Sequence, residues 1–182
     1  MAYRKGKKER PPLDQERLRE LALAYVGRFA TSRAKLGTYL GRKVRERGWD
    51  GEGGADIDGI VERLAELGYV DDAAFALSKS RSLTARGYGV RRVNESLRAA
   101  GIGDEDAEGA RELANTESVD AALRFARKRR FGPFAEKTCD RPARERALAA
   151  MVRAGHGFGI AAAILALEPG AEVDREMLAE NS

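Results

Sequence analysis

The sequence is poor in the residues from which disulfides, metal sites and nucleophilic triads are built. Its 182 residues include one cysteine, Cys139, and one histidine, His156. A single cysteine excludes an internal disulfide and suits a reducing compartment, so a cytoplasmic location is expected. A single histidine excludes a Cys–His metal cluster, and no nucleophile motif accompanies it for Ser–His–Asp chemistry. We therefore expect neither an enzyme nor a bound cofactor or metal.

Long apolar segments are also missing. The longest apolar run, residues 160–167, is far shorter than the roughly 20 residues that cross a bilayer. Residues 1–10 are basic like the start of a signal peptide, but Pro11, Pro12 and a charged segment follow where the apolar stretch should be. Neither export nor membrane association is expected.

Helical periodicity is the main positive signal, because no stretch alternates convincingly as a strand would. Ile57, Ile60, Val61, Leu64 and Leu67 recur at helical spacing, and Gly68 follows as a residue that accepts a left-handed helix end. Two helices precede this one. The later helices are expected near residues 72–86, 90–100, 104–114, 121–130, 144–154 and 158–167, and the core near Leu21, Tyr25, Leu64, Leu67, Tyr69, Phe75, Leu97, Leu123, Phe125, Leu148 and Ile164.

The helices repeat in groups of three. A glycine turn follows the second helix of each group, at Gly48, Gly101 and Gly155. A repeat of about 45 residues buries little surface alone, so neighbouring repeats must supply core to one another. The expected fold is all-α, an elongated array of three tandem helix-turn-helix-like repeats with nine helices. The expected parts are a basic disordered arm (1–13), repeat 1 (14–70), repeat 2 (71–117), repeat 3 (118–168) and an acidic frayed tail (169–182).

Charge alternates along the chain in register with these repeats. The net charge is +9 over residues 1–49 and −7 over residues 50–72, then +5, −6, +7 and −4 over 73–101, 102–120, 121–155 and 156–182. The first two helices of each repeat are thus basic, and the third, with its flanking turns, is acidic. A periodic basic stripe suits an extended polyanion or a filament groove. The alternative is that the basic and acidic stripes merely compensate each other on a charged surface and bind no partner.

The candidate binding residues are the cations of the basic segments. We expect contacts to an anionic partner from Arg33, Lys35, Arg42, Lys43, Arg81, Arg86, Arg91, Arg92, Arg98, Arg127, Lys128, Arg129, Arg130 and Arg144. The four consecutive cations from Arg127 to Arg130 cannot all face one side of a helix. Tyr88, Phe131 and Phe134 stand beside arginines and could stack on bases, although such residues are more often turn and core residues.

Residues 66–89 carry a family signature. The segment Leu67-Gly68-Tyr69-Val70-Asp71-Asp72 is followed by Phe75-Ala76 and then by Arg86-Gly87-Tyr88-Gly89. This combination resembles the RecX family of bacterial RecA regulators over about residues 15–168, with Val90 in place of a proline common in relatives. Asp71 or Asp72 can cap a helix, so the acid pair needs no catalytic role. The motif residues expected to be structural are Gly68, Tyr69, Asp71, Asp72, Phe75, Gly87, Tyr88 and Gly89.

The resemblance implies a function in recombinational repair and the SOS response. It implies a monomer that binds RecA and its filament on single-stranded DNA, with duplex DNA as a second ligand, and that restrains RecA ATPase, strand exchange and co-protease activity. One alternative is a helix-turn-helix-like DNA-binding protein that acts without RecA. Another is a structural adaptor for an unrelated acidic partner.

Overall fold

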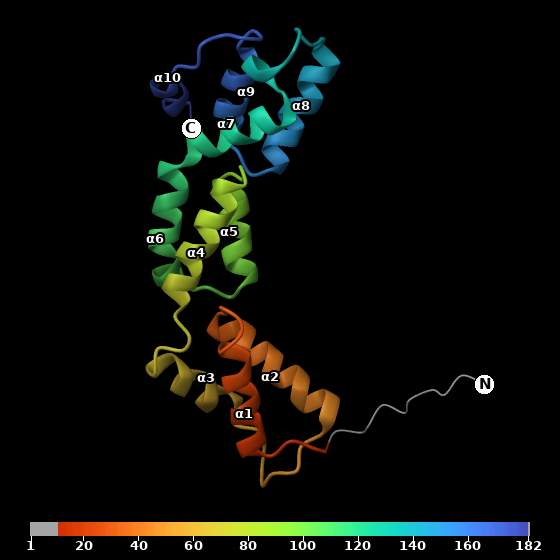
Figure 1. The fold of residues 1–182 in the computed structure, drawn as a ribbon, viewed down its shortest axis with the longest axis vertical. Helices are drawn as coiled ribbons and strands as arrows, with labels where there is room; N and C mark the ends of the chain where they lie inside the picture. The colour runs from red at the N-terminus through yellow and green to blue at the C-terminus, as the bar shows by residue number, and fades with distance from the viewer. Residues whose placement is uncertain (1–10, 182) are drawn as a thin grey trace, which may run out of the picture. The chain divides into compact units, whose positions relative to one another are not determined.

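The computed structural model describes residues 11–181, and within that range every regular element is a helix (Figure 1). Ten α-helices and one short 3₁₀-helix are present in this range, with a single isolated bridge between Leu13 and Trp49. The chain divides into two compact units, residues 1–71 and 72–182. Most of the predicted basic arm, residues 1–10, lies outside the described residues.

Unit 1 holds the three helices of repeat 1, and a side chain caps the start of each. Asp14, Ser32 and Asp56 accept hydrogen bonds from backbone N–H groups three residues ahead, at 2.8, 3.3 and 2.9 Å. Such caps satisfy donors that have no partner within the helix. Leu18, Leu36, Leu40 and other apolar side chains of the three helices form one core. The helices are α1 (Gln15–Val26), α2 (Arg33–Arg47) and α3 (Ile57–Glu66).

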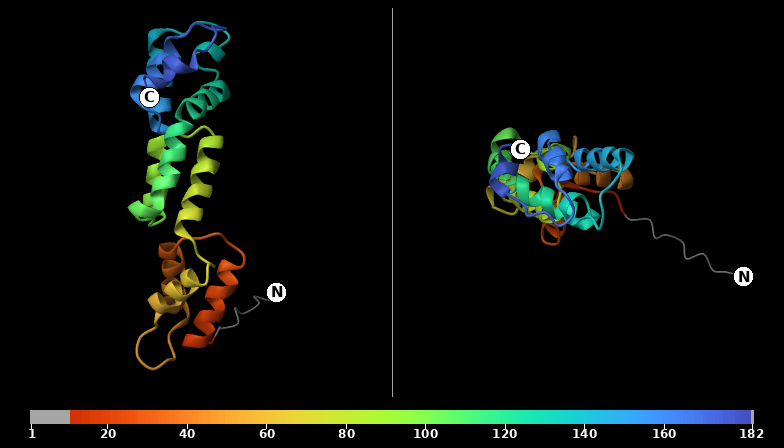
Figure 2. Two further views of the ribbon diagram at one scale, coloured as in Figure 1. Left: turned by 90° about the vertical axis from the view of Figure 1, so that its left-hand side faces the viewer. Right: turned by 90° about the horizontal axis from the view of Figure 1, so that it is seen from above.

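Repeat 2 begins unit 2, and its first and third helices lie side by side, as Figure 2 also shows from another direction. Their interface is built from small residues, including the buried Ala76, Ala107 and Ala110. The Ser80 hydroxyl donates to the Ala110 carbonyl at 2.8 Å, so the buried polar group is satisfied. The helices are α4 (Asp72–Ala85), α5 (Val90–Ala99) and α6 (Asp104–Thr116).

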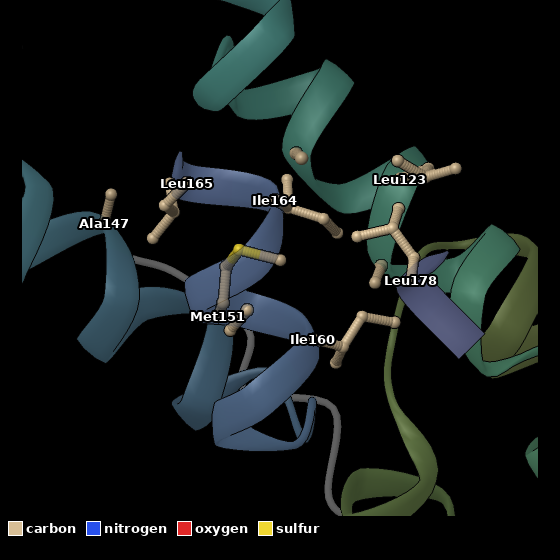
Figure 3. Close-up of a cluster of buried hydrophobic side chains, with 10 residues drawn as sticks. Leu123, Ala147, Met151, Ile160, Ile164, Leu165 and Leu178 are labelled. Carbon is tan, nitrogen blue, oxygen red and sulfur yellow. The ribbon is translucent and has the colours of Figure 1, made fainter. Parts of the chain in front are cut away.

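Repeat 3 packs around Met151, which is fully buried among the side chains drawn in Figure 3. Asp140 caps the second helix of this repeat by accepting from the Ala143 N–H at 2.8 Å. The elements are α7 (Ser118–Arg129), η1 (Gly132–Phe134), α8 (Arg141–Arg153) and α9 (Phe158–Ala166). The all-α class and the tandem three-helix organisation are thus confirmed.

The segment after residue 168 departs from the prediction. It forms a tenth helix, α10 (Arg175–Ala179), rather than a frayed tail. Asp174 caps it, and Leu178 is fully buried beside Leu123 and Ile160 (Figure 3). Burial of this one leucine is the physical reason that the helix is held.

Two of the predicted core residues are not buried in their own unit. Leu67 is 52% exposed and Tyr69 is 58% exposed. Both follow the last turn of α3, where the chain reverses and the helical stripe no longer sets the direction of the side chains. The buried predictions are Leu64, Leu97, Leu123 and Ile164, and the half-buried ones are Leu21, Tyr25, Phe75, Phe125 and Leu148.

Candidate binding surface

The predicted binding cations are distributed over both units. Unit 1 carries four of them on α2, where Arg33 and Arg42 are exposed and Lys35 and Lys43 are half-buried. The ten in unit 2 are all exposed. They are Arg81 on α4, Arg86 after it, Arg91, Arg92 and Arg98 on α5, Arg127, Lys128 and Arg129 on α7, Arg130 after it, and Arg144 on α8.

Several of these cations are partnered by carboxylates of the chain itself. Arg42 and Lys43 both bind Glu46, at 2.8 and 2.7 Å. Their hydrogen bonds, from Lys43 first and then Arg42, lower the pKa of that carboxyl below its usual value. In unit 2, Arg92 pairs with Glu95 at 3.2 Å, and Arg130 pairs with Glu136. Both of these pairs are exposed to solvent. Part of the predicted basic surface is therefore locally neutralised.

Three other cations of unit 2 lie over aromatic rings. The guanidinium carbon of Arg86 is 5.3 Å from the centre of the Tyr88 ring. Those of Arg127 and Arg129 are 4.9 and 5.7 Å from the rings of Phe134 and Phe125. These distances are in the range of cation–π attraction. The run of four cations is thus divided between two rings, a carboxylate and, at Lys128, exposed surface.

The first half of the family signature ends α3 and begins α4. Gly68 has φ +75°, and the N–H groups of Tyr69 and Gly68 donate to the carbonyls of Leu64 and Ala65, at 2.9 Å each. This is the Schellman arrangement expected of a helix-ending glycine. Asp71 precedes α4 at the cap position, and Asp72, 7% exposed, is the first residue of the helix.

The second half of the signature joins repeat 2 to repeat 3, backbone against backbone. The Gly89 N–H donates to the Ala154 carbonyl at 3.0 Å, and the Arg91 N–H donates to the Gly155 carbonyl at 3.1 Å. A Cβ on Gly89 would lie 2.3 Å from the Gly155 oxygen, so no side chain fits there. We call the segments 86–89 and 154–156 the glycine joint.

His156 closes the glycine joint from the repeat 3 side. It is 2% exposed, and its Nε2 lies 3.1 Å from the Gly87 carbonyl oxygen. Because a carbonyl only accepts, Nε2 carries the proton and donates. Burial lowers the pKa of His156, and the bond to Gly87 partly opposes that shift. The ring also lies 5.5 Å from that of Phe125. His156 is therefore a neutral structural group.

Glycines on both sides of this joint were noted in the sequence, but their contact with each other was not predicted. Gly87, Tyr88 and Gly89 belonged to the signature, and Gly155 was one of the turn glycines that recur after second helices. The repetition of those glycines was a signal for a turn but not for a contact. Within residues 11–181, no group of three or more His, Cys, Asp or Glu side chains is arranged to hold a metal ion. No helix in this range is long and apolar enough to cross a membrane.

Comparisons with known proteins agree on one family. Residues 71–110 match the family model described as RecX, second three-helix domain. The Regulatory protein RecX of Myxococcus xanthus is 35% identical over 178 residues, covering 90% of this chain and 94% of that protein. That of Agrobacterium fabrum is 32% identical over 130 residues, 69% of each chain.

Solved structures show the same fold. The crystal structure of RecX from Lactobacillus salivarius superposes with a TM-score of 0.63 at 20% identity, covering 82% of this chain and 93% of that one. A second structure, of a regulatory protein RecX, also gives 0.63, at 18% identity over 83% of this chain and 70% of that one. With its signature residues in place at the helix ends and the glycine joint, the chain belongs to the RecX family of regulatory proteins.

Proposed function

We propose that this protein binds RecA and the RecA filament on single-stranded DNA, and that it inhibits RecA ATPase, strand exchange and co-protease activity. Family membership supports the regulatory role. The observation that carries the mode of action is the exposure of twelve of the fourteen predicted cations, all on or next to the first two helices of their repeats. Such surfaces attract a polyanion or an acidic protein face over distances set by salt screening.

Acidic side chains on or after the third helices supply the opposite charge: they lie on α3 and α6 and, after the uncharged α9, within residues 168–180. α6 begins with Asp104, Glu105 and Asp106, and the macrodipole favours acidic residues in a first turn. Arg111 lies 2.6 Å from Asp104 and lowers the pKa of that carboxyl. Contact with the nucleoprotein filament would use the basic faces for DNA or acidic RecA surface and the acidic faces for basic RecA surface.

The test is a titration of the purified chain into cognate RecA on single-stranded DNA. Hydrolysis of ATP and strand exchange are followed from well below equimolar to several-fold excess. Inhibition at low ratios of chain to RecA is the expected result. The absence of inhibition at several-fold excess, with the chain shown by circular dichroism to be folded, contradicts the proposal. The helix-turn-helix alternative then predicts duplex binding in a salt series without RecA.

A further inference from the structure

Arg86, Arg127 and Arg129, which we call the ring-held arginines, share a second property besides their aromatic neighbours. Among residues 11–181, none of the three forms an ion pair with a carboxylate. Other exposed arginines of unit 2 do: Arg92 with Glu95, Arg130 with Glu136 and Arg141 with Glu145. The ring-held arginines therefore keep their full charge for an outside partner.

The aromatic rings restrain these side chains without neutralising them. A guanidinium lying over a ring is held by the negative face of the π-system, while its N–H edge stays available. A long arginine side chain otherwise loses much of its rotamer entropy when it is fixed by a ligand. Tyr88, Phe125 and Phe134 reduce that cost in advance. The same contact covers the rings, so they are poor platforms for stacked bases.

The segments that carry the three rings lie against one another in unit 2, next to the glycine joint. Arg86 and Tyr88 flank Gly87, whose missing Cβ would lie 3.0 Å from the Phe125 nitrogen. Arg129 lies over the Phe125 ring itself. The Phe125 ring is 6.4 Å from that of Phe131, the residue that precedes the 3₁₀-helix carrying Phe134. Two consecutive repeats thus place these arginines on neighbouring segments of unit 2.

We propose that the ring-held arginines bind the phosphodiester backbone of single-stranded DNA, and that their aromatic partners position them rather than stack on bases. This inference rests on the proposed function only for the presence of a DNA strand at the protein. Planar guanidinium groups suit phosphate because they present paired N–H donors to its oxygens. An arginine that is already paired with a carboxylate binds phosphate less readily, since the phosphate must displace that carboxylate first.

The experiment compares two triple variants that change the net charge equally. One variant carries Arg86→Gln, Arg127→Gln and Arg129→Gln. The matched control carries Arg63→Gln, Arg141→Gln and Arg175→Gln, three exposed arginines that pair with Glu66, Glu145 and Asp120 and are not among the predicted binding cations. Binding to fluorescent oligo-dT and to an abasic strand of the same length is measured against salt concentration. Circular dichroism and thermal melting check that both variants are folded.

The expected result is a loss of about tenfold or more in affinity for the first variant at 0.1 M salt. Its slope of log K against log salt should fall by about 2, since each lost contact to a single strand removes about 0.7. The control should change affinity less than about threefold. The loss in the first variant should be the same on oligo-dT and on the abasic strand, because both carry the phosphates.

Three results overturn the inference. Equal losses in the two variants show that net charge alone sets binding. A loss confined to oligo-dT shows that the rings or arginines contact bases. If the wild-type chain does not bind single-stranded DNA, the proposed site has no ligand. Inhibition of RecA by the wild-type chain is measured separately, so inhibition without a difference between the triples leaves the proposed function in place and refutes this site.

Discussion

At the scale of single residues, the glycine joint depends on two glycines for different reasons. Gly89 has φ −84°, which any residue adopts, and it is required because the Gly155 carbonyl occupies the place of a side chain. Gly155 has φ +96°, in the left-handed region, and a Cβ there would lie 2.5 Å from the Arg92 nitrogen. Space is therefore limiting at one position, and both space and conformation are limiting at the other.

Gly155→Ala is expected to lower the free energy of unfolding of unit 2 by about 3 kcal/mol or more. The left-handed conformation costs a non-glycine residue about 1–2 kcal/mol, and the contact with the Arg92 backbone adds to it. Gly170→Ala is the control, because Gly170 has φ +79° with open space around it and should cost only about 1 kcal/mol. Urea unfolding measures both. Equal costs in the two variants contradict the close packing of the joint.

His156 gives unit 2 a pH dependence with a definite sign. Its pKa is lowered in the folded protein, so below pH 6.5 the unfolded chain binds a proton that the folded chain does not. Stability is fully present above pH 6.5 and is lost as the pH falls toward the folded pKa. Between pH 7 and pH 5.5 the wild-type chain should lose up to about 1 kcal/mol.

His156→Gln is the comparison, since glutamine retains an N–H donor for the Gly87 carbonyl but does not titrate. Urea unfolding at pH 7 and pH 5.5 should show a smaller loss for this variant than for the wild type. The difference between the two proteins removes the contribution of the carboxylates that they share. A loss of the same size in both proteins refutes a neutral, buried His156.

At the scale of elements, helix positions were predictable and one short helix was not. Caps such as Ser32 and the glycine ends at Gly68 and Gly87 are local signals, so most helices begin and end within a few residues of their predicted bounds. α10 has five residues, and its single buried side chain, Leu178, finds its partners in the core of repeat 3 rather than in neighbouring residues of the chain. Tertiary packing rather than periodicity creates this helix.

The partners of the candidate binding cations were also predictable only in part. The pair Arg92–Glu95 spans three residues of one helix and could be inferred from spacing alone. The pairing of Arg130 with Glu136, across the left-handed turn at Arg130, could not. Neither could the position of Arg127 over Phe134, which depends on how η1 folds back toward α7. The sequence thus predicted which segments are basic but not which cations stay available.

Leu178→Ala tests the attachment of α10. The side chain is fully buried with Leu123, Ile160 and Ile164, so its truncation should lower the free energy of unfolding of unit 2 by about 2–3 kcal/mol. Arg175→Ala is the control on the same helix. It removes an ion pair with Asp120 whose partners are 67% and 41% exposed, and should cost about 0.5 kcal/mol or less. A cost near zero for Leu178→Ala would contradict the attachment of α10 and support the predicted frayed tail.

At the scale of the whole molecule, the two units have separate cores, and both carry predicted binding cations. The core of repeat 1 contains only residues of unit 1, whereas the cores of repeats 2 and 3 belong to unit 2 and are linked by the glycine joint. Each unit therefore has the means to fold by itself, although unit 1, with about 60 described residues, should be marginal. Covalent linkage matters for binding if both units contact the same filament.

The corresponding prediction concerns the two units supplied as separate chains, residues 1–71 and 72–182. After circular dichroism has shown that each is helical, their equimolar mixture should need about tenfold or more of the intact chain's concentration to inhibit RecA ATPase equally. The reason is that linkage makes the second contact intramolecular, with an effective concentration near the millimolar range for a short linker. Equal potency of residues 72–182 alone and the intact chain contradicts this prediction. Such a result would exclude Arg33, Lys35, Arg42 and Lys43 from the binding surface and confine that surface to repeats 2 and 3.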